Sequence, residues 1–127
     1  MVMRVVRGIH VLLFVMLLAV ACAPTVDQAP AATPDPVARG RDLYTRTCSP
    51  CHGPDATGIP GLGKNLVGSE MLEQNSDATI VSFIKAGRPI DDPQNTTGLE
   101  MPPYGGNTLL SDADLFAIVA YLRSLGR

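Results

Sequence analysis

Apolar positions follow a helical period in three stretches of the chain. The clearest lies near the C-terminus, where one helix face is formed by Leu115, Ile118, Val119 and Leu122. Ser111 and Asp114 precede this face with the spacing of a capping box, and Gly126 follows it as a stop signal. We therefore predict a helix over residues 111–124.

Two further helices are predicted upstream. Asp35 followed by Pro36 is a helix start, and the helix would continue to Thr47 with Gly40, Leu43 and Tyr44 along one face. The next helix is predicted over Asp77–Ala86 and ends at Gly87, with one face formed by Ile80, Phe83 and Ile84. Because no stretch alternates as a strand does, these patterns predict an all-α domain.

The segments between the helices are long and rich in Gly, Pro, Asn and Thr. Residues 53–69 and 87–108 are predicted to be loops, and structureless loops of this length usually enclose something. The apolar fraction of 46% is inflated by the first 23 residues, and the rest of the chain holds few large apolar side chains. A small domain with so lean a core needs a disulfide, a metal or a buried cofactor.

The first residues have the pattern of an export signal. Arg4 and Arg7 precede an uninterrupted apolar run over residues 11–21, which is short of the roughly 20 residues of a membrane span. We predict an export signal over residues 1–21 and a folded domain over residues 37–127. Three outcomes remain open for the signal: lipidation, simple secretion, and an uncleaved anchor helix. All three place the domain outside the cytoplasm.

The sequence Leu18-Ala19-Val20-Ala21-Cys22 resembles a bacterial lipobox, in which the cysteine becomes the first residue and carries lipid. The resemblance implies lipidation of Cys22 and anchoring to the outer, periplasmic face of the bacterial cytoplasmic membrane. Residues 22–36 hold the lipid site and a tract rich in Pro and Ala. Such a tract is a semi-rigid tether that could reach about 40 Å when extended.

Length and charge exclude several classes of protein. A chain of 127 residues holds one domain at most, which excludes a TIM barrel or a polytopic transporter. Its net charge of -2 argues against a nucleic-acid-binding module, which is usually basic.

The candidate chemistry lies in Cys48-Ser49-Pro50-Cys51-His52, the C-x-x-C-H pattern of covalent c-type haem attachment. Two thiols at this spacing can add to the two vinyl groups along one porphyrin edge, and the next residue brings an imidazole to the iron. His52 is then the proximal ligand. A zinc site would need four ligands, and a thioredoxin-like pair would need a βαβ pattern, neither of which the sequence supplies. A plain disulfide would leave His52 unexplained.

Residues 39–53 resemble the N-terminal helix and haem motif of class I c-type cytochromes, and the resemblance extends over about residues 36–127. Gly40 and Tyr44 stand at the family's glycine and aromatic positions, and Ala120-Tyr121-Leu122 resembles its C-terminal contact. The resemblance implies a small cytochrome c-like fold. Its N- and C-terminal helices would cross through Gly40 and Tyr121, and its loops would wrap one covalent haem c.

Met101 is the predicted distal ligand, because Met101-Pro102-Pro103-Tyr104-Gly105-Gly106 resembles the family's ligand loop. The alternatives are Met71, an open site or a lysine. The stretch Gly63–Gly68 resembles the loop beneath the proximal histidine, which makes the backbone carbonyl of Lys64 a candidate acceptor for the imidazole N–H. Arg88 could neutralise a haem propionate.

A haem with two axial ligands has no open position for a substrate, which predicts an electron carrier rather than an enzyme. We expect a membrane-anchored carrier that shuttles electrons between respiratory or photosynthetic membrane complexes. Its partners would be the membrane and redox proteins, with no nucleic acid and no small-molecule substrate. One alternative is a fixed haem c subunit of a quinol-oxidising complex such as alternative complex III. Another is a haem sensor or peroxidase with a labile sixth ligand.

Overall fold

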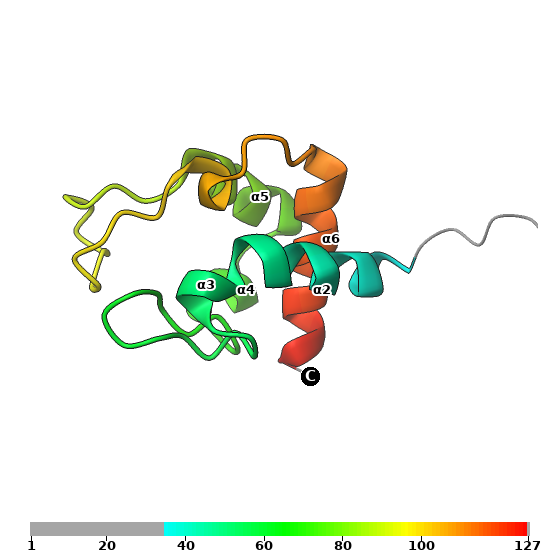
Figure 1. The fold of residues 1–127 in the computed structure, drawn as a ribbon, viewed down its shortest axis with the longest axis horizontal. Helices are drawn as coiled ribbons and strands as arrows, with labels where there is room; N and C mark the ends of the chain where they lie inside the picture. Colours follow the sequence, from blue (N-terminus) through cyan, green and yellow to red (C-terminus); the bar gives the residue numbers. More distant parts are fainter. Residues whose placement is uncertain (1–34, 127) are drawn as a thin grey trace, which may run out of the picture. The chain divides into compact units, whose positions relative to one another are not determined.

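The computed structural model describes residues 35–126, which form helices joined by long loops, with no strand among them (Figure 1). The prediction of an all-α fold is confirmed. The elements are α2 (Pro36–Thr47), α3 (Ser49–His52), α4 (Glu70–Gln74), α5 (Asp77–Ala86), a 3-10 helix η1 (Pro103–Gly106) and α6 (Asp112–Leu125). The predicted signal, Cys22 and nearly all of the tether lie outside the described residues.

Helices α2 and α6 cross in close contact (Figure 1). Gly40 lies at the crossing, where an added Cβ would stand only 1.9 Å from the carbonyl oxygen of Ala117 and 3.0 Å from Cβ of Tyr121. One turn further along α2, the ring of Tyr44 packs against that of Tyr121 with centroids 5.4 Å apart. The crossing implied by the family resemblance is thus confirmed, because only a residue without a Cβ lets the two backbones approach this closely.

Helix α6 supplies more of the core than any other helix and begins as the sequence predicts. Its four predicted core residues are all buried: Leu115, Ile118, Val119 and Leu122. The hydroxyl of Ser111 accepts from the backbone N–H of Asp114, and the Asp114 carboxylate accepts from the backbone N–H of Ser111. This reciprocal capping satisfies N–H groups that the first turn of a helix leaves without partners.

Helix α5 has the predicted bounds but a different buried face. Ile80 and Ile84 are buried, whereas Phe83 is only half-buried and Val81 takes its place in the core. The ring of Phe83 instead lies beneath the guanidinium of Arg88, whose central carbon is 4.9 Å from the ring centroid. Phe83 thus shares the predicted face with Ile80 and Ile84, but its ring packs against a cationic partner as well as the helix surface.

The sequence missed three short elements. α4 and α3 were not predicted, and η1 lies within the segment 87–108 that was predicted to be a loop. Arg123, in the last turn of α6, holds α4 in place. Its guanidinium donates to the carbonyl oxygens of Leu72 and Asn75 and to Oδ1 of Asp77, at 2.6, 2.7 and 2.6 Å.

The loops between α3 and α4 and between α5 and η1 both extend away from α6, to the left in Figure 1. Among residues 35–126, no helix is both long and apolar enough to cross a membrane.

Candidate functional site

The two cysteines and the histidine of the C-x-x-C-H motif lie around one short helix. Cys48 caps the end of α2, and α3 carries Cys51 and His52. The carbonyl oxygen of Cys48 accepts from the backbone N–H of His52 at 3.0 Å, which closes the turn. Behind the turn, the buried hydroxyl of Tyr44 donates to the carbonyl oxygen of Gly53 at 2.6 Å. The core of the α2–α6 pair therefore fixes where the motif ends.

Both thiols of the motif are free, with Cys48 half-buried and Cys51 exposed. Burial, and to a smaller extent the neighbouring Cys51, raises the pKa of the Cys48 thiol to about 11. Redox-active C-x-x-C pairs need the opposite, a thiol whose pKa is lowered so that the thiolate forms at neutral pH. The surroundings of Cys48 thus do not suit a dithiol redox catalyst.

The imidazole of His52 is oriented by a hydrogen bond to the next loop. Its Nδ1 lies 2.8 Å from the carbonyl oxygen of Lys64, and a carbonyl can only accept. Nδ1 is therefore the protonated nitrogen, which leaves Nε2 with a free lone pair for a metal. Gly63 permits the contact, because a Cβ there would stand 2.4 Å from the Cys51 carbonyl oxygen and 3.1 Å from Nδ1 of His52.

Met101 lies two residues before the start of η1 and is held through its backbone. Its N–H donates to the carbonyl oxygen of Arg88 at 2.9 Å, and its carbonyl oxygen accepts from the N–H of Arg88 at 2.8 Å. Its side chain is half-buried and packs against the core cluster. After it, Pro102 and Pro103 restrict the backbone and Tyr104 has a φ of 56°, a left-handed conformation that L-residues seldom adopt.

The guanidinium of Arg88 has partners within the protein. It lies 3.6 Å from Oδ1 of Asp92 and donates to Oε1 of Gln94 at 3.3 Å, in addition to its place over Phe83. The role of Arg88 at a haem propionate stays a prediction. The sequence offered no signal for the Gln94 contact, which depends on how the loop folds back.

Met71, the other methionine considered as a ligand, lies on α4. Its sulfur is 3.5 Å from the side-chain nitrogen of Asn75, one turn later on the chain. Within residues 35–126, no three His, Cys, Asp or Glu side chains cluster as a metal site.

The two long loops expose apolar side chains. Three large apolar residues on the two loops are exposed, namely Leu62 at 44%, Ile90 at 64% and Leu99 at 46%, while no polar or charged residue among residues 35–126 is buried. Apolar side chains that a domain leaves exposed are available to contact an apolar ligand. Two free thiols and an oriented imidazole are the side-chain groups that haem c attachment requires.

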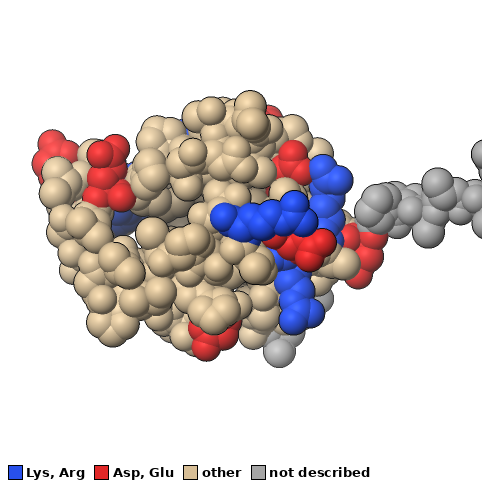
Figure 2. Space-filling model, viewed as in Figure 1, with Lys and Arg blue, Asp and Glu red and all other residues tan. Residues whose placement is uncertain are grey.

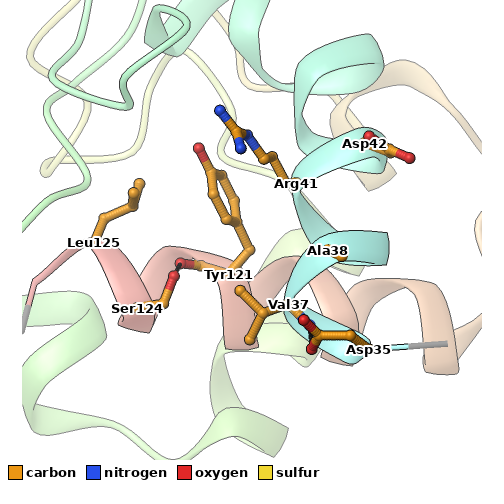
Figure 3. Close-up of a pocket in the computed structure, with 8 residues that line it drawn as sticks. All are labelled: Asp35, Val37, Ala38, Arg41, Asp42, Tyr121, Ser124 and Leu125. Carbon is orange, nitrogen blue, oxygen red and sulfur yellow. Dashed lines mark hydrogen bonds between the residues drawn. The ribbon is translucent and has the colours of Figure 1, made fainter. Parts of the chain in front are cut away.

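A groove between the first turn of α2 and the last turn of α6 is separate from the motif (Figure 3). The ring of Tyr121 stands between the two helices, with Arg41 at its hydroxyl end and Val37 and Leu125 alongside (Figure 3). None of the predicted haem residues lines it.

Comparison with known proteins also indicates a haem c site. Residues 35–122 match the family described as cytochrome c oxidase, cbb3-type, subunit III. The chain is 32% identical over 93 residues to the cbb3-type cytochrome c oxidase subunit CcoP of Rhodobacter capsulatus, which covers 68% of this chain and 28% of that protein. It is 31% identical to FixP of Rhizobium etli, over 71% of this chain and 31% of that protein.

A shorter relative is matched over most of its length. Cytochrome c-555 of Chlorobaculum tepidum is 29% identical over 85 residues, which are 67% of this chain and 72% of that protein. The chain thus spans under a third of the two oxidase subunits but most of the small cytochrome. No solved structure matches the chain significantly.

Proposed function

Because the chain belongs to this family of cytochrome c domains, which carry one covalently bound haem c, we propose that it transfers single electrons as a membrane-anchored carrier. The observation that carries the proposal is the orientation of His52. Its Nδ1 is bonded to the Lys64 carbonyl, so that Nε2 is available beside two free thiols. Haem c supplies a reversible one-electron couple when bound at such a site.

Each residue of the site has a distinct role in the proposal. The sulfurs of Cys48 and Cys51 would hold the haem covalently, and His52 and Met101 would be its proximal and distal ligands. The Lys64 carbonyl fixes the imidazole and increases its basicity as a ligand. If His52 and Met101 both bind the iron, no position on it would be left for a substrate, which supports a carrier over an enzyme, sensor or peroxidase.

The surface suits brief contact with a redox partner. Figure 2 shows basic side chains gathered over α2, acidic side chains at the tip of the loop between α5 and η1, and a large uncharged area between them. Transient redox complexes use small interfaces. We infer that a partner approaches this uncharged area.

The proposed anchor is a lipid on Cys22, which would confine the carrier to the outer face of the cytoplasmic membrane. Replacing Cys22 with serine would then release the protein from the membrane fraction, while a protein that stays membrane-bound would favour an uncleaved helix. Release of the wild-type protein in soluble form would favour simple secretion.

A fixed subunit is a second candidate function, because CcoP and FixP are named as subunits of an oxidase. The similarity to cytochrome c-555 over most of that protein's length favours a separate carrier. Purification from membranes separates the two. A shuttle purifies alone, whereas a subunit purifies with partners in fixed stoichiometry.

The ligand assignment is tested by replacing Met101 with alanine in the haem-loaded protein. We expect the Met–Fe(III) charge-transfer band to disappear while the haem stays attached. Met71→Leu is the matched control and should leave the band unchanged. A band that persists in Met101→Ala would overturn the assignment, and rapid cyanide binding by the resting wild-type protein would favour a sensor or peroxidase.

A further inference from the structure

The loop between α5 and Met101 is tied together around one asparagine. Oδ1 of Asn95 accepts from the backbone N–H groups of Thr97 and Gly98, each at 3.1 Å. Its Nδ2 donates to the carbonyl oxygens of Pro89 and Leu99 at 3.1 and 2.7 Å. Residues 89–100, called the strap here, therefore have a defined shape although they contain no helix or strand.

The ends of the strap meet at Arg88 and Met101, which pair through the two backbone hydrogen bonds described above. Gly87, one residue earlier, lies against the same segment. A Cβ there would stand 2.4 Å from the Met101 carbonyl oxygen and 2.8 Å from the nitrogen of Pro103. A displacement of the strap is therefore transmitted directly to the backbone of Met101.

The middle of the strap contacts the loop beneath His52. The carbonyl oxygen of Gln94 accepts from Nζ of Lys64 at 3.4 Å, and the Lys64 carbonyl accepts from His52. The side-chain oxygen of Gln94 accepts from both terminal nitrogens of Arg88. Gln94 thus touches one residue that orients His52 and one residue that holds Met101.

We propose that Gln94 is a positioning residue that couples the segments of the two axial ligands and keeps Met101 in place. The inference rests on the proposed function, because it requires Met101 to be the distal ligand. Loss of either Gln94 contact would let the strap open more often, and an external ligand would then replace the methionine more easily. Because Gln94 is exposed, its substitution should not unfold the domain.

The experiment measures imidazole binding to the ferric, haem-loaded protein. For Gln94→Leu we expect the apparent affinity for imidazole to rise about fivefold, the magnitude of one lost hydrogen bond. Lys64→Met, which keeps its backbone carbonyl, should produce a similar rise. Gln94→Glu keeps an oxygen for Arg88 and should stay close to wild type. Gln74→Leu is the control, since Gln74 is an exposed glutamine at the end of α4.

Amide hydrogen exchange gives a second measurement that does not depend on ligand binding. Exchange at the backbone N–H of Met101 should accelerate by a similar factor in Gln94→Leu, because that N–H is bonded to Arg88. Imidazole affinity and Met101 exchange that both stay within twofold of wild type would overturn the proposal. If instead the wild-type protein lacks the Met–Fe(III) band and binds imidazole freely, the distal-ligand assignment itself has failed.

Discussion

The carbonyl oxygen of Lys64 lies 2.8 Å from Nδ1 of His52, although the two residues belong to different segments of the chain. The contact uses the backbone, so the residue type at position 64 does not decide it. The contact depends instead on the residue type at position 63, because Gly63 lets the loop reach the turn that carries Cys51 and His52. The proposed orientation of the proximal ligand therefore depends on a glycine.

Gly63→Ala should disturb the proximal side. The new Cβ would stand 2.4 Å from the Cys51 carbonyl oxygen, so the loop has to retreat and the bond to His52 lengthens. An imidazole that loses this acceptor is a weaker donor, and we expect the reduction potential to rise on the order of 50 mV. Redox titration measures it. Gly61→Ala adds a Cβ in the same loop that meets nothing within 4 Å and should leave the potential nearly unchanged, so an equal shift in both variants would contradict the explanation.

Gly40→Ala should destabilise the domain as a whole. An added Cβ 1.9 Å from the Ala117 carbonyl oxygen forces α2 and α6 apart, which we expect to lower the free energy of unfolding by about 2–3 kcal/mol. Urea denaturation measures the change. Ala38→Ser, an exposed substitution on the same helix, should cost less than about 0.5 kcal/mol. A similar cost for both variants would show that the crossing is not tightly packed.

Arg123→Ala should loosen α4. The variant leaves the carbonyl oxygens of Leu72 and Asn75 without their donor, and we expect a loss of about 1.5–3 kcal/mol in the free energy of unfolding. Arg123→Lys should lower the free energy of unfolding by a smaller amount, because an ammonium cannot reproduce the fork of a guanidinium. Arg46→Ala, an exposed arginine in the last turn of α2, is the control. Stability within about 0.5 kcal/mol of wild type would contradict the assigned role.

The capping carboxylate of Asp114 gives the domain a defined acid dependence. Hydrogen bonds from Ser111, and then from Arg39, lower the pKa of Asp114 to about 2. Since an unfolded aspartate titrates near about 3.9, the carboxylate stabilises the fold fully above that pH, and this contribution is lost as the pH falls toward 2.

The test compares the wild-type protein with Asp114→Asn by urea denaturation across the pH range. At pH 6 the variant should be less stable by about 1 kcal/mol or less, because the carboxylate is near the surface and screened by solvent. The difference should shrink between about pH 4 and pH 2. A difference that stays constant over that range would mean that the charge of Asp114 does not matter.

The helices were predictable because they depend on local sequence. The cap at Ser111 and Asp114 and the apolar spacing of α6 are readable without a structure, and both are observed. α4 was not predictable, because it has only five residues and is held by Arg123, which lies 51 positions beyond Leu72. A helix this short gains its stability from tertiary contacts rather than from its own residues.

The site, like the fold, has residues that the sequence predicts and contacts that it does not. The C-x-x-C-H motif and Met101 stand out in the sequence because their chemistry depends on residue type. The contacts that position them are made by backbone atoms and by side chains distant in sequence, such as Lys64 and Gln94, 30 residues apart. No local pattern encodes a contact that forms only when two loops fold toward each other, so Gln94 was not predicted.

The most direct test of the account is mass spectrometry of the purified protein after denaturation and digestion. The account predicts that one haem stays covalently attached to the peptide that contains Cys48 and Cys51. Recovery of that peptide with two free thiols, or with a disulfide and no haem, from cells able to attach haem c would contradict it.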